Sequence, residues 1–217
     1  MPPVPSFFSH PGNFTAALVH RSYCNEHPGL PSNERLEFLG DAVLSLIISH
    51  RLYTLLPTLP EGELTARRSY LVRTPSLAAK SQSLGLDKLL KLSRGEEDSG
   101  GRNNPSLLAN TFEAVLGSLY LDSGLPTCQE YLSLVFPDSE LTGPMPTKDP
   151  KSLLQEKSQE LGWGTPNYRL VSATGPDHAK QFTVEVSLGS IGPTTGQGKS
   201  IQKAETEAAT AALTNLL

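Results

Sequence analysis

The sequence predicts an α+β protein with two domains: an all-helical domain over residues 1–143 and an α-β-β-β-α domain over 150–217, joined by a linker over 144–149. Three observations support this division. Apolar residues recur with helical spacing through the first part of the chain. Residues 181–188, QFTVEVSL, instead alternate with a period of two, which is typical of a strand. The prolines and glycine of TGPMPTKDP, 142–150, separate the two patterns and indicate a linker.

The first domain is predicted to be a series of helices divided at prolines and glycines. Asn33 is a residue type that favours helix caps, so one helix is expected to begin at Glu34. The segment RGEEDSGGRNNP, 94–105, is polar and rich in glycine, and we expect a solvated loop there. The predicted helices span residues 14–23, 33–56, 61–73, 75–83, 86–91, 105–123 and 126–135.

The second domain is predicted to hold two helices and up to three strands. The first helix covers 150–161, with proline at its first position, where a missing amide hydrogen costs nothing. NYRLVSA, 167–173, and QFTVEVSL are predicted strands, and GPTTGQG, 192–198, is a short third strand or a loop. The final stretch, 199–217, is rich in alanine and strongly favours a helix.

The composition excludes several classes of protein. A chain of 217 residues with 37% hydrophobic and 18% charged residues can build packed cores. Its net charge of −4 gives no global signature of nucleic-acid binding. Cys24 and Cys128 lie far apart without a C-x-x-C motif, so neither a disulfide framework nor a zinc site is indicated. The N-terminus does not look like a signal peptide, and the longest apolar run, 42–48, is too short to span a membrane. We therefore expect a cytoplasmic protein with no membrane segment.

Carboxylates interrupt the apolar stretch NERLEFLGDAVLSLIISHRLY. Glu34, Glu37 and Asp41 are spaced three and four apart, so they share one stripe of a helix. Glu34 is also explained as an acid in the first helical turn, where the helix dipole favours it. Glu37 and Asp41 have apolar neighbours nearly all round, and a buried carboxylate is costly unless a cation or donors compensate. A structural ion pair with Arg35 or Arg51 is the alternative to a functional site.

A second apolar stretch, LLANTFEAVLGSLYLD, repeats the pattern. Asn110 and Glu113 lie three apart in it. Two apolar helices that each carry oxygen-bearing side chains could bring four oxygens together. Such a set of ligands suits hard cations such as Mg²⁺ or Mn²⁺. A site of this kind performs phosphate chemistry by activating water and neutralising charge.

These motifs resemble a known family. NERLEFLGDAVL is similar to the signature of the ribonuclease III family, endonucleases that cut double-stranded RNA. PEGELTARRSYLVR, 60–73, and ANTFEAVLGSLYLD resemble two further helices of its nuclease domain, and the α-β-β-β-α unit resembles its double-stranded RNA-binding domain. The resemblance covers nearly the whole chain in the right order, although the extreme N-terminus looks short.

The resemblance implies an activity and its partners. It implies a homodimeric endoribonuclease that hydrolyses phosphodiester bonds in double-stranded RNA with Mg²⁺, or with Mn²⁺. The products would carry 5′-phosphate and 3′-hydroxyl ends. The expected substrates are ribosomal RNA precursors and structured messenger RNAs, and no small-molecule cofactor is expected.

The resemblance also assigns roles to side chains. Glu37, Asp41 and Glu113 match the family's metal-binding carboxylates, and Asp41 and Glu113 are expected to be catalytic. Asn110 stands where many members carry aspartate and would complete the ligand set. An amide oxygen can bind a hard cation but lacks the charge, so we expect weaker metal affinity rather than lost chemistry.

Three further positions match the family's cleft and its dimer. Glu34 and Glu61 match acids at the rim of the cleft. Phe38 matches an aromatic residue that packs into the partner subunit, although an ordinary core phenylalanine fits the sequence equally well. His20, in LVHRSY, is expected to be a structural residue rather than a general base.

The RNA-binding domain is expected to read the shape of the duplex across its minor groove. The loop GPDHAK would reach a second minor groove, and the start of the last helix would bind the phosphates between the two. Ile201 and Gln202 stand where the family usually has basic residues, so we expect a lower affinity and a shallower salt dependence. The residues implied in RNA binding are Ser152, Gln155, Gln159, His178, Lys199, Ser200 and Lys203.

Two other functions are compatible with parts of this pattern. A relative that binds duplex RNA without cutting it, such as a ribosome-associated protein, fits Asn110 and the thin basic patch. The three remaining carboxylates argue against it. An unrelated helical scaffold with a protein-binding tail would show no duplex binding, and the glutamines of the first RNA-binding helix would then be ordinary exposed residues.

Overall fold

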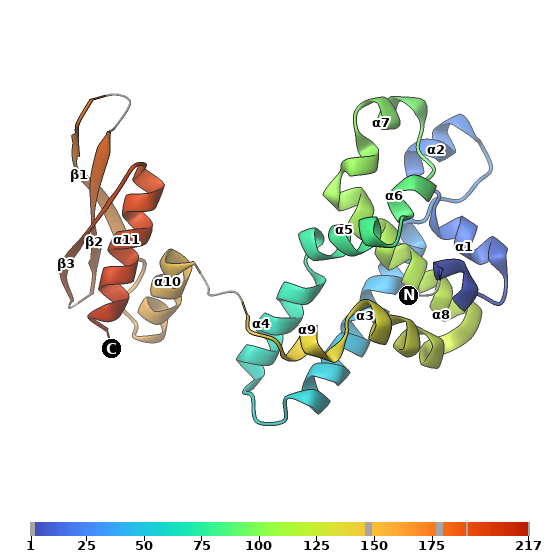
Figure 1. Cartoon of the computed structure of the whole chain (residues 1–217), viewed down its shortest axis with the longest axis horizontal. Helices are drawn as coiled ribbons and strands as arrows, with labels where there is room; N and C mark the ends of the chain where they lie inside the picture. The colour runs from blue at the N-terminus through green and yellow to red at the C-terminus, as the bar shows by residue number, and fades with distance from the viewer. Residues whose placement is uncertain (1–2, 146–148, 177–179, 190, 217) are drawn as a thin grey trace. The chain divides into compact units, whose positions relative to one another are not determined.

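The computed structural model describes the chain except for residues 1–2, 146–148, 177–179, 190 and 217. The chain forms two compact units, Met1–Pro144 and Met145–Leu217, each described here by itself (Figure 1). Within the described residues the first unit is helical, and the second combines helices with a sheet. The predicted fold class is therefore confirmed.

The first unit contains most of the predicted helices and some that were not predicted. Helix α9 and the 3₁₀ turn η1 are among the latter. Its elements are η1 Val4–Phe7, α1 Pro11–Ala17, α2 Arg21–Glu26, α3 Glu34–Leu55, α4 Glu61–Val72, α5 Thr74–Ser83, α6 Leu86–Leu89, α7 Arg94–Asp98, η2 Gly101–Asn103, α8 Pro105–Val135 and α9 Asp138–Thr142.

Helices α3 and α8 form the centre of the first unit. Leu44 and Ile48 of α3 and Phe112 and Leu116 of α8 are fully buried in one hydrophobic core. Helix α3 begins at Glu34, as predicted, but the predicted capping role of Asn33 is wrong. The Asn33 side chain makes no cap hydrogen bond, and it is buried where its amide donates to the Ala17 carbonyl (3.0 Å).

Two glycines allow α3 and α8 to approach closely. A Cβ atom added to Gly40 would lie 1.7 Å from the backbone oxygen of Glu113, and one added to Gly117 would lie 2.1 Å from that of Leu36. Only glycine fits at such a crossing. The contact also decides which turns of the two helices face each other.

Element α8 consists of two helices that meet at Gly124. The sequence predicts separate helices over 105–123 and 126–135, and the structure agrees, because the backbone of Gly124 is not helical (φ 78°, ψ 179°) and Pro126 follows it. The positive φ is a conformation that glycine adopts without strain. The predicted break between the two helices is therefore confirmed, and it takes the form of a sharp kink.

The predicted helix over 14–23 is wrong, because α1 and α2 are separate. His20 is extended (φ −71°, ψ 149°), and its side chain accepts a hydrogen bond from the Ser22 amide, which starts a new helix. Val19 forms an isolated parallel bridge with Lys91. This contact across the fold overrides the local helical spacing.

The predicted loop over 94–105 is also wrong, since it contains α7 and η2. Ser93 caps α7 with its hydroxyl. Arg102 donates to the backbone carbonyls of Asp87 and Leu90, both at 2.9 Å. A polar segment is folded here because a guanidinium group satisfies the carbonyl groups of a neighbouring segment.

Among the described residues one helix, α3, is long and apolar enough, by length and composition alone, to cross a membrane. The sequence prediction considered only the shorter uninterrupted run within it. Its buried side chains belong to the core shared with α8, and its first turns carry Glu37 and Asp41. We interpret α3 as the core helix of this unit.

A buried carboxylate attaches the N-terminal segment to α8. The Asp122 side chain has no exposed surface, and it accepts hydrogen bonds from the Ser123 hydroxyl (2.6 Å), the Ser9 amide (2.6 Å) and the Asn13 side chain (2.8 Å). These donors hold the pKa of Asp122 well below its usual range. The ionised form is therefore the one that stabilises the fold.

Asp122→Asn is expected to lower the free energy of unfolding at pH 7. The difference in this free energy between variant and wild type should be smaller at pH 3. A carboxyl whose folded-state pKa is depressed stabilises the fold above the unfolded-state pKa of about 3.9, and the stabilisation fades as the pH falls below that value. Urea unfolding of both proteins at pH 7 and pH 3 measures the difference. Asp98→Asn, an exposed position in α7, is the matched control. If the two proteins differed in free energy of unfolding by the same amount at both pH values, the ionised form of Asp122 would not be the one that stabilises the fold.

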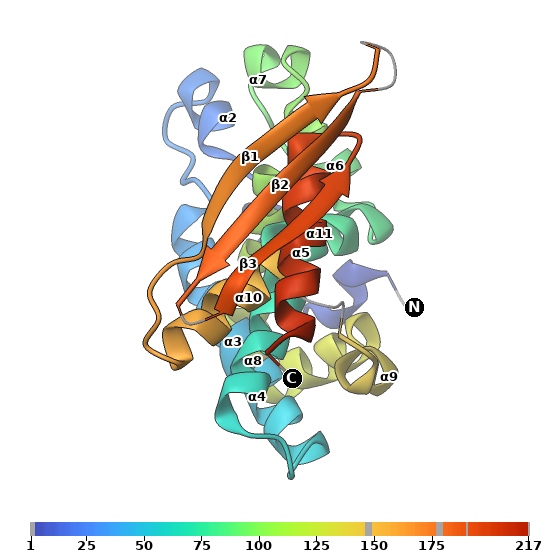
Figure 2. The ribbon, with the colours of Figure 1, turned by 90° about the vertical axis from the view of Figure 1, so that its left-hand side faces the viewer.

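The second unit is a three-stranded antiparallel sheet with helices packed against it (Figure 2). The strand order is β1-β2-β3, so the segment predicted as a strand or a loop is a strand. Its elements are α10 Pro150–Glu160, β1 Asn167–Thr174, β2 Gln181–Leu188, β3 Ile191–Gly198 and α11 Ile201–Thr214.

Small residues bring α11 onto the sheet. Ala208 and Ala212 of α11 are buried with Leu154 of α10 and Val186 of β2 in one core. A Cβ atom on Gly196 of β3 would lie 2.1 Å from the Ala208 nitrogen. The alanines that predicted a helix therefore also allow it to lie close to the sheet.

Candidate functional site

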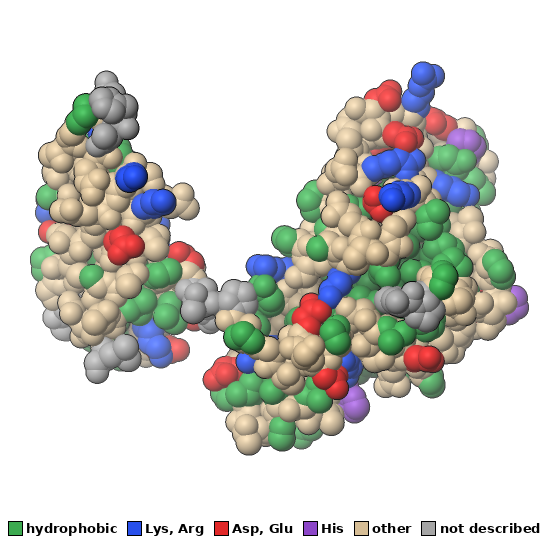
Figure 3. Space-filling view, in the orientation of Figure 1, with side chains coloured by type: hydrophobic (Ala, Val, Ile, Leu, Met, Phe, Trp, Pro, Cys, Tyr) green, Lys and Arg blue, Asp and Glu red, His purple; other side chains and the backbone are tan. Residues whose placement is uncertain are grey.

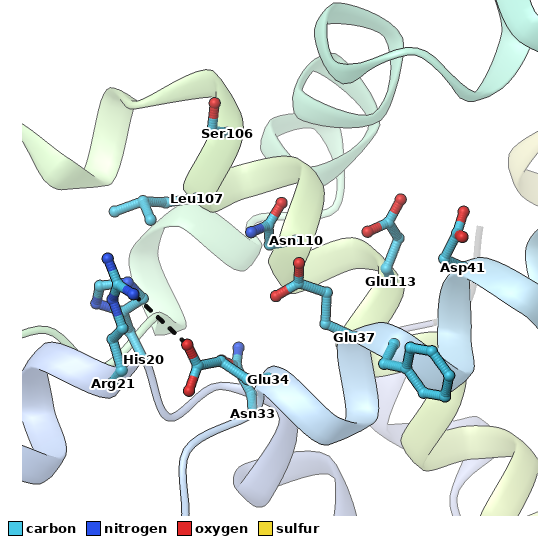
Figure 4. Close-up of a pocket in the computed structure, with 11 residues that line it drawn as sticks. His20, Arg21, Asn33, Glu34, Glu37, Asp41, Ser106, Leu107, Asn110 and Glu113 are labelled. Atoms are coloured by element: carbon cyan, nitrogen blue, oxygen red, sulfur yellow. Dashed lines mark ion pairs between the residues drawn. The ribbon is translucent and has the colours of Figure 1, made fainter.

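The predicted carboxylates line one pocket of the first unit, with a volume of about 680 Å³. Its walls come from the first turns of α3, the N-terminal part of α8 and the residues around the start of α2 (Figure 4). The lining residues are His20, Arg21, Asn33, Glu34, Glu37, Phe38, Asp41, Ser106, Leu107, Asn110 and Glu113.

The two helices place their oxygen-bearing side chains on facing walls. Glu37 and Asp41 lie one turn apart on α3, and Asn110 and Glu113 lie three residues apart on α8. Figure 4 shows the carboxylates of Glu113 and Asp41 beside each other, with Glu37 next to Asn110. The close crossing at Gly40 positions Glu113 opposite this turn of α3.

The electrostatics of the pocket are those of crowded carboxylates. Burial, together with the charges of Asp41 and Glu37, raises the pKa of Glu113 to about 7. Burial and the charge of Glu34 raise the pKa of Glu37, and a hydrogen bond with Asn110 opposes that rise. A set of like charges of this kind is relieved when a cation enters.

The donor set fits a hard divalent cation in composition, because Glu37, Asp41, Asn110 and Glu113 all offer side-chain oxygens to the pocket. Among the described residues, however, no three Asp, Glu, His or Cys side chains are already arranged as a metal site. The carboxylates would have to approach one another further before they could share one ion.

The expectation that these carboxylates are enclosed by the core is wrong. Asp41 is exposed and Glu37 is half-buried. Two apolar residues of α3 are exposed as well, Phe38 at 81% and Leu46 at 59%. The alternative that Phe38 is an ordinary core phenylalanine is therefore wrong. The exposed apolar surface of α3 that includes Phe38 needs an explanation.

The ion-pair alternative for the carboxylates fails for Arg51. Its guanidinium donates to the Leu132 carbonyl (3.0 Å) and to Asp138 (2.6 Å), on the other side of the core. Arg35 lines a different, largely apolar groove. Among the described residues, Glu37, Asp41 and Glu113 therefore form no ion pair with either arginine.

The two acids predicted at the rim of the cleft lie in different places. Glu34 lines the pocket, where it accepts a hydrogen bond from Ser32 (2.8 Å) and pairs with Arg21. Glu61 instead lies in a separate hollow of about 200 Å³ between α3 and α4, where it accepts from Thr65 (2.8 Å). Within one chain Glu61 is not part of the carboxylate pocket.

Several residues of this pocket have no role in it that the sequence predicts, and two of them lie outside α3 and α8. His20 and Arg21 come from the separate segment that starts α2. His20 acts as the helix cap, which agrees with its predicted structural role, and burial lowers its pKa. No spacing in the sequence relates this segment to α3 or α8, so only the fold could place it here.

A groove of about 740 Å³ lies on the other side of Phe38. Phe38 and Glu34 line both hollows, so the groove adjoins the pocket. Its floor is largely apolar and includes Leu36, Leu39 and Leu121. Leu121 is 65% exposed.

The second unit presents the predicted RNA-binding side chains on its surface. Within the described residues, the predicted RNA-binding positions on α10 and at the start of α11 are exposed, whereas Ser158 of α10 is buried. An ion pair of Lys151 with Glu205 (2.5 Å) joins the two helices. Ser200 also caps α11 by accepting from the Lys203 amide (3.2 Å). His178 lies outside the described residues. The exposed residues are Ser152, Gln155, Gln159, Lys199, Ser200 and Lys203.

Comparison with known proteins finds similarity over both units. Residues 13–138 match the family model described as ribonuclease-III-like, and 150–216 match the double-stranded RNA binding motif. Ribonuclease 3 of Streptomyces coelicolor is 46% identical over 198 residues, which are 90% of this chain and 71% of that protein. Ribonuclease 3 of Streptococcus thermophilus is 42% identical over 212 residues, 96% of this chain and 93% of that protein.

A solved structure resembles the first unit. The nuclease domain of ribonuclease III from Campylobacter jejuni superposes with a TM-score of 0.57 at 32% identity. The alignment covers 62% of this chain and 94% of that one. That structure's description refers to a region involved in dimer formation.

Proposed function

The chain belongs to the ribonuclease III family and is a double-stranded-RNA endoribonuclease, and we propose that Glu37, Asp41, Asn110 and Glu113 form its catalytic centre. The observation that carries the proposal is the convergence of these side chains from α3 and α8 in one pocket. The family is metal-dependent, and we propose Mg²⁺, with Mn²⁺ as a substitute, as its ion.

Each residue of the centre has a distinct part. Asp41 and Glu113 supply charged oxygens from opposite walls, and Glu37 supplies a third beside Asn110. A divalent cation held there would neutralise charge on the phosphate to be cut and lower the pKa of water. The crowding that raises the pKa of Glu113 is relieved when positive charge is added.

The second unit binds the RNA duplex, and this binding raises the concentration of duplex at the catalytic centre. The exposed polar residues of α10 suit the minor groove, where shape and 2′-hydroxyl groups are read. Lys199 and Lys203 suit the phosphates. We place these contacts on α10 and on the start of α11.

The exposed face of α3 is proposed to be covered by a second copy of the chain. Phe38 is too large and too exposed to be left in water without a reason, and the apolar groove beside it has room for an aromatic ring. In a symmetric dimer the same patch meets itself, so each Phe38 would enter the partner's groove. In such a dimer Glu61 could reach the rim of the partner's pocket.

We also propose the finer features of the activity that the resemblance implies. The products carry 5′-phosphate and 3′-hydroxyl ends. The substrates are ribosomal RNA precursors and structured messenger RNAs. The enzyme works in the cytoplasm.

The test is cleavage of a labelled long RNA duplex by the full chain with Mg²⁺, with Mn²⁺ and with chelator. We expect cutting that needs the ion and the duplex, with single-stranded RNA and DNA duplex as controls. Binding in a gel shift without cutting under any of these conditions would favour the silent RNA-binding alternative instead.

Asn110→Asp is expected to lower the Mg²⁺ concentration needed for half-maximal cleavage by about tenfold. The substitution adds a negative charge to a site that the ion must neutralise, and one full charge at such range contributes roughly 1 to 2 kcal/mol. A titration of initial rate against Mg²⁺ measures the shift. Asn104→Asp, at the exposed start of α8, is the control for charge alone. An unchanged midpoint would mean that Asn110 does not contact the ion.

A further inference from the structure

The catalytic pocket contains one permanent positive charge. Arg21 is the only lysine or arginine among the described residues that line it. Figure 4 shows Arg21 and His20 at the end of the pocket away from Asp41 and Glu113. Because the pKa of His20 is lowered by burial, its imidazole is neutral near pH 7 and adds no charge. The pocket is therefore divided into an acidic end and an end with a single cation.

Arg21 is held only loosely. Its Nη1 atom lies 3.7 Å from Oε1 of Glu34, beyond the 2.7–2.9 Å typical of a charge-assisted hydrogen bond. The two side chains are 73% and 54% exposed. An exposed pair at this distance contributes little to stability, so its guanidinium can exchange partners.

Other cations of the first unit are committed to holding the fold. Arg51 binds Asp138 and Lys80 binds Glu140, each at 2.6 Å, and Arg67 donates to the backbone near the end of the unit. On the face seen in Figure 3, basic and acidic side chains are interspersed over α6 and α7 and form no continuous basic surface. A single cation inside the pocket therefore matters more for a polyanionic substrate.

Building on the proposed function, we propose that Arg21 binds the RNA backbone phosphate next to the one that is cut, and that its guanidinium exchanges its loose partner Glu34 for that phosphate. An acidic pocket repels a phosphate chain, and a cation at its rim offsets that repulsion. A guanidinium group also fits phosphate oxygens through two parallel hydrogen bonds. Arg21 is thus a substrate-binding residue that fixes which phosphate reaches the carboxylates.

Steady-state cleavage of a long duplex by the full chain tests the proposal, with Arg21→Ala, Arg21→Lys and Arg94→Ala compared with wild type. Arg94 is exposed in α7 outside the pocket, so its variant controls for lost charge. We expect Arg21→Ala to raise KM about tenfold with kcat changed less than about twofold. The slope of log kcat/KM against log salt concentration is negative, and it should become shallower by about one in Arg21→Ala. Arg21→Lys should recover part of the KM loss.

Two outcomes would overturn the proposal. One is a KM and a salt slope in Arg21→Ala that equal those of wild type. The other is a KM above that of wild type in Glu34→Gln. This variant keeps Arg21 but removes its carboxylate partner, so we expect its KM to be lower than that of wild type. A raised KM would show that the RNA needs the Arg21–Glu34 ion pair and not a free guanidinium group. Absence of cleavage by the wild type would instead refute the proposed function, so the two failures are distinguishable.

Discussion

Glu113→Gln is expected to lower kcat on duplex RNA at least about a hundredfold while duplex binding is unchanged. Loss of a residue that only supports a metal ligand costs about ten- to a hundredfold, and loss of the ligand itself should cost more. The glutamine keeps the size of the side chain but not the charge that faces Asp41 across the pocket. Single-turnover cleavage with saturating enzyme measures the rate, and a gel shift in Ca²⁺ or chelator measures binding.

Two controls separate lost chemistry from misfolding. Glu130→Gln changes an exposed position of the same helix and should leave the rate unchanged. In chelator, Glu113→Gln should be more stable than wild type at pH 8. The folded-state pKa of Glu113, about 7, lies above the ordinary 4.5, so the wild type loses stability as the pH rises between these values, whereas glutamine does not ionise. A variant that still cuts at the normal rate would remove Glu113 from the mechanism.

The local pattern of the sequence predicted the elements that carry the site. Helix α3 begins at Glu34 as expected, although Asn33, the residue that predicted this start, makes no side-chain cap hydrogen bond. Helical spacing predicted that Glu37 and Asp41 share a stripe, and likewise Asn110 and Glu113. The close contact that makes the stripes face each other depends on Gly40, and nothing in the local pattern names its partner turn on α8.

The predictions that failed involve partners distant in sequence. Asn33 has the chemistry of a cap, but a hydrogen bond to Ala17 takes its side chain. The glycine-rich segment after Ser93 folds because Arg102 reaches back to an earlier segment. Arg21 enters the pocket from a helix whose start is set by His20. Helical and strand periodicity cannot reveal such contacts, because they depend on how elements pack.

Gly40→Ala is expected to lower the free energy of unfolding by about 3 kcal/mol, the upper range for overpacking a core. The added Cβ would meet the Glu113 carbonyl at 1.7 Å, and backbone cannot move aside as a flexible side chain can. Helix α3 must therefore shift from α8, which separates Asp41 from Glu113 and should also reduce cleavage. Urea unfolding and cleavage rates measure both effects. Gly62→Ala, in α4 with nothing within 4 Å of the added atom, is the control and should be neutral or stabilising by up to about 1 kcal/mol. A Gly40→Ala protein as stable and active as the control would show that the two helices tolerate separation at this crossing.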